Sequence, residues 1–167
     1  MTAATTLRVE MIRSHALTDV ERAAVLGLRI DAEQVEFAGP VARSVAACDA
    51  GDPAEVAGLA IRLGGDVVGW VVLKRGASVP DWVDVGAVVV SGLRIDARHQ
   101  GRGVGSAVLA EMARWVARSW PESTRMVLRV DDGNGAGIRA YEKSGWIEVG
   151  ERLVGRVGLE RTMTFAL

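Results

Sequence analysis

The sequence predicts an α/β fold, built as a mixed sheet with helices on both faces. Short runs that are apolar throughout, or that alternate between apolar and polar residues, indicate strands, whereas longer runs with helical spacing indicate helices. These two kinds of segment interleave along the chain in the order β-α-α-β-β-β-α-β-α-β-β. No internal repeat, low-complexity tract or linker interrupts them, so we expect residues 1–167 to form one domain.

The first third of the chain predicts one strand followed by two helical segments. Residues 7–13 alternate between apolar and charged side chains, as a half-buried strand does. A capping box, Thr18-Asp-Val-Glu21, should begin a helix that ends near Arg29. Residues 32–49 predict a second helical region, which is interrupted near Gly39-Pro40.

The remaining elements follow in two groups around a glycine-rich loop. Gly64-Gly65-Asp66 separates two apolar runs and predicts a β-hairpin. Ser91-Gly92 lies inside the next, longer strand, where it indicates a bulge or a place where something approaches the backbone. The expected elements are strands 56–63, 67–74 and 86–96, helix 105–119, strand 126–130, helix 138–144, and closing strands 146–149 and 162–166.

Composition and charge exclude several classes of function. The net charge of −1 gives no electrostatic basis for binding nucleic acid or an anionic membrane. Cys48 is the only cysteine, which excludes an intramolecular disulfide, and His15 and His99 are too few for a usual zinc site, so we expect no bound metal. Residues 1–6 lack a signal pattern and no run of about 18 apolar residues occurs, which leads us to expect a soluble cytoplasmic protein.

The most informative segment is the loop Gln100-Gly-Arg-Gly-Val-Gly-Ser106, which joins a strand to a helix. Its glycines allow a ligand to approach the backbone closely, and the free N–H groups at the start of a helix attract anions. We therefore expect a phosphate or pyrophosphate ligand, with a glycine-rich turn that binds nothing as the alternative. The loop lacks the lysine of a P-loop and the third glycine of a dinucleotide-binding fingerprint.

Two blocks of the sequence resemble the GCN5-related N-acetyltransferase (GNAT) family. Residues 100–105, Q-G-R-G-V-G, are similar to its acetyl-CoA signature, Q/R-x-x-G-x-G/A. Residues 134–146, N-G-A-G-I-R-A-Y-E-K-S-G-W, resemble its second block, N-x-x-A-x-x-x-Y-E-K-x-G-F, with Gly137 in place of the usual alanine and Trp146 in place of phenylalanine. The resemblance implies a GNAT-like mixed, mostly antiparallel sheet and direct transfer of an acetyl group from acetyl-CoA to a primary amine.

The resemblance also implies a set of contacts with acetyl-CoA. Backbone N–H groups of the glycine-rich loop would hold the pyrophosphate, backbone groups of Leu93 and Ile95 would pair with the pantetheine arm, and Asn134 would contact that arm. Tyr141 would act as general acid to the departing thiolate, because a tyrosine with a pKa of about 10 stays protonated at neutral pH. Lys143 could contact the cofactor's phosphates, as could Arg102 of the loop. The alternatives are a turn asparagine, a core tyrosine and solvated basic side chains. The loop residues concerned are Gln100, Gly101, Arg102, Gly103, Val104, Gly105 and Ser106.

The acceptor is an amine whose identity the sequence leaves open. A weaker resemblance of residues 31–44 to bacterial spermine/spermidine acetyltransferases, together with nearby acidic residues, favours a small cationic amine. Glu33 and Glu36 would bind such a cation or pass its proton, with solvated helix residues as the alternative, and Trp82 would line its site. A polyamine, an amino acid, an aminoglycoside, and a peptide or protein amine all stay open, as does a non-catalytic acyl-CoA-binding domain. We identify no general base, and a homodimer is compatible with the family.

Overall fold

A seven-stranded sheet with the strand order β1-β2-β3-β4-β5-β7-β6 organises residues 7–167, which are the residues that the computed structural model describes. Neighbouring strands are antiparallel except for β4 and β5, which pair in parallel. The predicted mixed, mostly antiparallel sheet is therefore confirmed. The strands are β1 (Val9–Arg13), β2 (Val56–Leu63), β3 (Asp66–Lys74), β4 (Ala87–Ile95), β5 (Arg125–Asp131), β6 (Ile147–Val154) and β7 (Leu159–Ala166).

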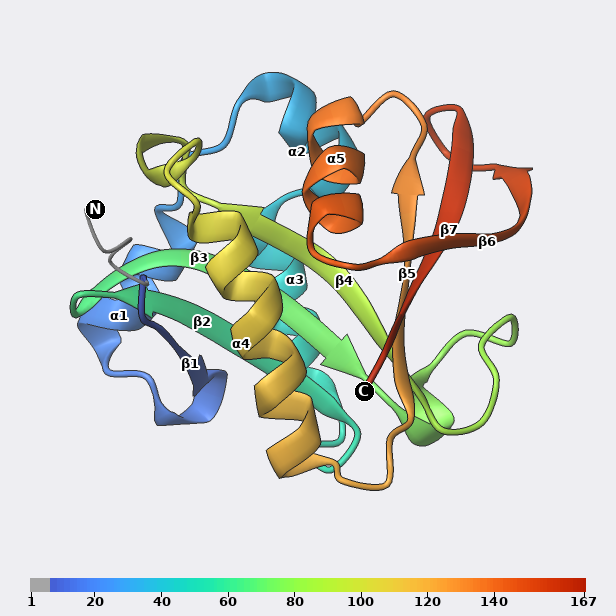
Figure 1. The fold of residues 1–167 in the computed structure, drawn as a ribbon. Helices are drawn as coiled ribbons and strands as arrows, with labels where there is room; N and C mark the ends of the chain where they lie inside the picture. Colours follow the sequence, from blue (N-terminus) through green and yellow to red (C-terminus); the bar gives the residue numbers. More distant parts are fainter. Residues whose placement is uncertain (1–6) are drawn as a thin grey trace, which may run out of the picture.

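Helices cover both faces of this sheet, as Figure 1 shows. Helices α4 and α5 lie on the near face, and α1, α2 and α3 lie on the far face. Helices α2 and α5 both lie at the end of the sheet where β4 and β5 finish. The helices are α1 (Asp19–Leu26), α2 (Ala32–Ala38), α3 (Val41–Ala50), α4 (Val104–Ser119) and α5 (Gly135–Lys143).

Each face of the sheet has its own apolar core. Under α4 and α5, the core includes Val108 and Met112 of α4 and Met126 and Leu128 of β5, all of which are buried. Under α1 and α3, a smaller core surrounds Trp70, whose indole Nε1 donates a hydrogen bond of 2.9 Å to Ser44 Oγ. Apolar side chains on both faces explain why β2 and β3 read as nearly continuous apolar runs.

Several predicted boundaries were wrong, and long-range contacts explain two of them. Helix α1 ends at Leu26 rather than near Arg29, because the Arg29 backbone N–H bonds to the distant Asp96 carboxylate and the Arg29 carbonyl accepts from Ala97 N–H. Strands β6 and β7 extend beyond the expected 146–149 and 162–166, because backbone pairing between them continues where β6 is exposed and carries no apolar pattern.

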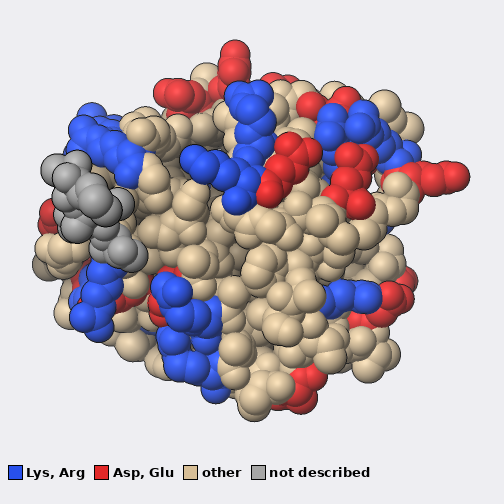
Figure 2. Space-filling view, in the orientation of Figure 1, with Lys and Arg blue, Asp and Glu red and all other residues tan. Residues whose placement is uncertain are grey.

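Charged side chains of both signs are interspersed on the face shown in Figure 2. Ion pairs join many charged residues of the protein, such as Arg118 with Glu111 at 2.7 Å and Arg161 with Asp132 at 2.6 Å. Among residues 7–167, no helix combines the length and the apolar character needed to cross a bilayer.

Candidate active site

The site lies where strands β4 and β5 separate. Their parallel pairing covers only Ala87 to Val89 of β4 and Arg125 to Val127 of β5. Beyond these residues the two strands no longer pair, and a cavity of about 330 Å³ opens between them. Residues of α2, of the loop before α4 and of α5 complete its walls. One edge of β4 is therefore unpaired along the cavity, where an extended ligand can add like a strand.

The predicted irregularity in β4 is confirmed at Gly92. Two residues of β4, Gly92 and Leu93, lie opposite the single residue Val71 of β3, which is the pattern of a β-bulge. Gly92 has a φ of +60°, a conformation that residues with a Cβ rarely adopt. The bulge bends β4 at the point where it leaves β5.

The glycine-rich loop leads into the start of α4, where backbone N–H groups have no hydrogen-bond partner within the helix. Gly101 and Gly103 have φ values of +73° and +77°, and Gly103 precedes the first residue of α4, Val104. No side chain caps this helix, and no acidic residue lies in its first turn. The first N–H groups of a helix have no partner within the helix, so this end can bind an anionic group such as a pyrophosphate.

The side chain of Gln100 fixes this loop to its surroundings. Its Nε2 donates to the Ile95 carbonyl at 2.8 Å and to Gln34 Oε1 at 2.9 Å, and Gln34 Nε2 donates back to Gln100 Oε1 at 3.2 Å. The loop is thus joined both to the end of β4 and to helix α2, which forms the opposite wall of the cavity.

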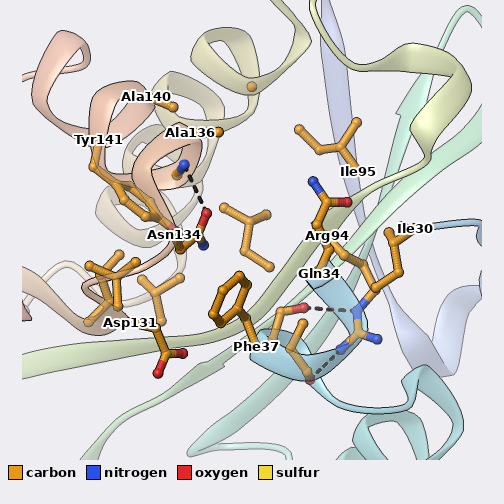
Figure 3. A pocket seen from close by; sticks show the side chains of 18 of the residues that line it. Ile30, Gln34, Phe37, Arg94, Ile95, Asp131, Asn134, Ala136, Ala140 and Tyr141 are labelled. Carbon is orange, nitrogen blue, oxygen red and sulfur yellow. Dashed lines mark hydrogen bonds between the residues drawn. The ribbon is translucent and has the colours of Figure 1, made fainter. Parts of the chain in front are cut away.

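Tyr141 and Asn134 lie on the α5 side of the cavity, as Figure 3 shows. Tyr141 packs against Trp146 with ring centroids 5.6 Å apart, and burial raises the pKa of its phenol to about 12. Asn134 Oδ1 accepts from Gly137 N–H at 3.1 Å and so caps α5. A Cβ at position 137 would lie within 3.0 Å of the Asn134 side chain, so the unusual Gly137 leaves room for this cap.

Helix α2 forms the facing wall, and Arg94 holds it there. The buried Arg94 guanidinium donates to the carbonyls of Ala38 and Gly39 at the end of α2, at 3.0 and 2.8 Å, and its Nε donates to Gly92 O at 3.1 Å. Gln34 and Phe37 of the same helix point toward the cavity (Figure 3).

The structure brings together only part of the predicted set. The predicted residues that line the cavity are Leu93, Ile95, Gln100, Gly101, Gly105, Asn134 and Tyr141. Arg102, Gly103 and Ser106 are exposed on the same loop, whereas the side chain of Val104 is buried in the core. Lys143, Glu33 and Glu36 are exposed and do not line the cavity.

Trp82 lies in a second hollow, of about 440 Å³, on the α1–α3 side of β5. Its ring stacks under the guanidinium of Arg129, with 3.9 Å between Arg129 Cζ and the ring centroid. Because Arg129 lines both hollows, it stands between Trp82 and the main cavity.

Sequence reasoning missed five cavity residues with charged, amide or aromatic side chains. Helical spacing could have found two of them, since Gln34 and Phe37 lie three residues apart and so share one face of α2, whereas their charge singled out Glu33 and Glu36. Strand alternation could have found two more, since Arg129 and Asp131 alternate with the buried Leu128 and Val130. The fifth, Arg94, carries no local signal of its role. The missed residues are Gln34, Phe37, Arg94, Arg129 and Asp131.

Comparison with known proteins agrees with this geometry. The model of the acetyltransferase (GNAT) family matches residues 23–146, which is more than half of the sequence, and the chain belongs to this family. Members of the family are acetyl-CoA-dependent N-acetyltransferases, so the protein is an acyltransferase that uses acetyl-CoA as its donor. No curated protein matches the sequence.

Solved structures with the same fold include three informative ones. The aminoglycoside acetyltransferase AAC(6')-Ib in complex with coenzyme A superposes with a TM-score of 0.73 at 20% identity, covering 95% of each chain. Spermidine N-acetyltransferase from Vibrio cholerae, in complex with CoA and spermine, gives 0.69 at 16% identity and covers 95% of each chain. The GNAT domain of S. lividans PAT gives 0.70 at 25% identity and covers 96% of this chain and 90% of that chain. The likeness at these identities concerns the fold.

Proposed function

We propose that the protein transfers the acetyl group of acetyl-CoA directly to the primary amine of a small molecule, such as a polyamine or an amino acid. One observation carries this proposal. A single cavity joins the uncapped start of α4, the unpaired edge of β4 and the Tyr141 phenol, and it reaches the wall formed by α2. We also propose that residues 1–167 act as one acetyltransferase domain.

The donor side of the cavity fits the parts of acetyl-CoA in order. The pyrophosphate lies against the backbone N–H groups of residues 100–106, where Arg102 of the same loop adds positive charge, and Lys143 at the end of α5 contacts the cofactor's phosphates from the α5 side. The pantetheine arm pairs with the free edge of β4 at Leu93 and Ile95, and the Asn134 side chain faces the arm from α5. This order places the thioester beside Tyr141.

The chemistry assigned to Tyr141 follows from its environment. The neutral amine nitrogen attacks the thioester carbonyl carbon and loses one proton to solvent, while the C–S bond breaks and the sulfur leaves with the electron pair, to be protonated to the thiol. Because the pKa of Tyr141 is about 12, its phenol keeps its proton at neutral pH and donates it as a hydrogen bond to the developing thiolate.

The acceptor enters from the α2 side in this proposal. Small amines are favoured because the cavity, of about 330 Å³, is bounded by α2, α5 and the two diverging strands. Two of the structurally similar proteins are named for small amines: one is an aminoglycoside acetyltransferase, and the other is a spermidine N-acetyltransferase with bound spermine. Glu33 and Glu36 lie on the exposed face of α2, where they would attract a cationic acceptor before it enters.

Thermal unfolding with and without acetyl-CoA tests the donor assignment, with NAD and ATP as controls. At about 100 times its Kd, a ligand stabilises the folded state by about 2.7 kcal/mol, which raises the Tm of a domain of this size by about 5–10 °C. A shift with acetyl-CoA alone, followed by thiol release in the presence of amines, supports the proposal. A shift without thiol release for any amine would indicate an acyl-CoA-binding protein, and a shift only with NAD or ATP would refute the donor assignment.

A further inference from the structure

Two oppositely charged residues face the acceptor side of the cavity from the end of β5. Arg129 and Asp131 both line the cavity, and they lie two residues apart on the same face of the strand. The intervening Val130 and the preceding Leu128 point the other way, into the core under α4 and α5. The two charges therefore lie on the side of the sheet from which the acceptor enters.

Arg129 has no carboxylate partner among residues 7–167. Its guanidinium stacks on Trp82, and its buried Nε makes no hydrogen bond. The neighbouring arginines are paired, since Arg125 contacts Asp84 and Arg161 contacts Asp132. A stacked guanidinium keeps its in-plane N–H donors free, and those donors match the geometry of a carboxylate.

Asp131 is also left without a partner. Its Oδ1 is buried and accepts no hydrogen bond from any described residue, and the side chain faces the cavity near Phe37 (Figure 3). Buried polar atoms without partners are rare in folded proteins, because each one costs free energy. Two such atoms, of opposite charge character and on the same strand face, call for a ligand that supplies both partners.

We propose that the acceptor is a small amine that also carries a carboxylate, as an amino acid does, with Arg129 receiving the carboxylate and Asp131 receiving the ammonium group. This proposal rests on the acetyl-transfer function proposed above. Positions two residues apart on a strand are separated by about 6.6 Å, a span that one small zwitterion can bridge when it binds between the two side chains. A polyamine or an aminoglycoside carries positive groups and no carboxylate, so Arg129 would repel its charges and gain no anionic partner from it.

Matched pairs of amines that differ by one carboxylate test this assignment. Suitable pairs are lysine with cadaverine, ornithine with putrescine, and phenylalanine with phenethylamine. We expect wild-type kcat/KM to favour at least one carboxylate-bearing member by about tenfold or more, since a hydrogen-bonded charge contributes about 1.5–3 kcal/mol and tenfold corresponds to about 1.4 kcal/mol.

Variants of Arg129 separate charge recognition from packing. Arg129→Met keeps an apolar side chain against Trp82, and it should abolish the preference for carboxylate-bearing amines by raising their KM. The rise in Tm with acetyl-CoA should be the same as in the wild type. Arg129→Lys should restore part of the preference. Arg125→Gln is the matched control, because it removes another arginine of β5 that already pairs with Asp84, and it should leave the preference unchanged.

The outcomes distinguish the two proposals. Equal or better use of the amines without a carboxylate, or no acetylation of any carboxylate-bearing member, would overturn the zwitterion assignment while acetyl transfer to other amines still stands. A preference that survives in Arg129→Met would also overturn it. Absence of any acetyl-CoA melting shift in the wild type would overturn the proposed function, and the acceptor assignment with it.

Discussion

Replacing Asp96 with asparagine tests how the donor loop is anchored. Asp96 follows β4 directly, and its side chain is completely buried. Its carboxylate accepts four hydrogen bonds, from Arg29 N at 3.0 Å, from Arg98 N at 3.0 Å, and from Arg98 Nε and Nη2 at 2.8 and 3.1 Å. These bonds tie the segment after α1 to the segment that leads into residues 100–106.

The expected magnitude follows from these contacts. In Asp96→Asn, the remaining oxygen can accept from one backbone N–H, whereas the new NH₂ group faces the other donor. Hydrogen bonds to a charged group contribute about 1.5–3 kcal/mol each, and leaving one buried donor unpaired adds a cost of similar size. We therefore expect the free energy of unfolding at pH 7 to fall by about 2–4 kcal/mol, which lowers the Tm by about 5–15 °C.

The loss should depend on pH in one direction. Hydrogen bonds from the Arg98 side chain, and then from the backbone N–H groups of Arg29 and Arg98, hold the pKa of Asp96 well below its usual range. A carboxylate whose folded-state pKa is depressed stabilises the protein above the unfolded pKa of about 4, and this contribution fades as the pH falls below it. The difference between wild type and Asp96→Asn should thus be constant from about pH 5 to 8 and shrink below about pH 4.

Urea unfolding followed by tryptophan fluorescence at pH 7, 5 and 3.5 measures this difference. Arg98→Gln is the control, because it removes the exposed partner and leaves both backbone donors on the carboxylate, so it should destabilise the protein less. The variant Asp96→Asn should also bind acetyl-CoA more weakly, since its loop is less fixed. A loss below about 1 kcal/mol, the value of an ordinary hydrogen bond, or a loss that is unchanged at pH 3.5, would refute the reasoning.

Three further predictions concern other parts of the molecule. Tyr141→Phe should lower kcat by about 10²-fold, while acetyl-CoA should still raise the Tm of the variant as it does for the wild type. An unchanged kcat would exclude Tyr141 as the acid. Because burial raises the pKa of Tyr141 to about 12, the wild-type kcat should show no loss from ionisation of this phenol below about pH 11. Gly103→Asp places a negative charge beside the start of α4, where it should repel the pyrophosphate and abolish the rise in Tm with acetyl-CoA. Gly103→Asn is the control: asparagine is uncharged and tolerates the φ of +77° at this position, so most of the rise in Tm should be retained. Cys48 lies on the buried face of α3, and burial raises the pKa of its thiol to about 11, so it should not react with a disulfide reagent at pH 8 until the protein is unfolded in guanidinium. Rapid labelling of the folded protein would contradict this burial.

The sequence predicted those features that depend on neighbouring residues. The hairpin at Gly64-Gly65, the irregularity at Gly92 and a helix that begins within one residue of the predicted Gly105 each follow from glycines at particular positions. The capping box at Thr18 formed as expected, because its two hydrogen bonds join residues only three apart. Such features need no knowledge of the rest of the chain.

The acceptor side could not be predicted in the same way. The sequence pointed to the charged residues Glu33 and Glu36, but the face of α2 that lines the cavity carries Gln34 and Phe37. Arg94 determines which face that is, because it bonds the carbonyls at the end of α2 from a strand that lies far along the chain. No local pattern encodes such a contact.

The sequence by itself therefore determined the two GNAT blocks, the glycine-rich loop and the order of the elements, except that the interrupted helical region 32–49 is two helices, α2 and α3, since all of these are written in short stretches of chain. Only the tertiary structure decided where β4 and β5 stop pairing, which residues of α2 face the gap, and which charges, Arg129 and Asp131, have no partner among residues 7–167. The physical reason is that strand register and ion pairing depend on residues that are distant in sequence, and a side chain's partner is fixed only when the elements pack.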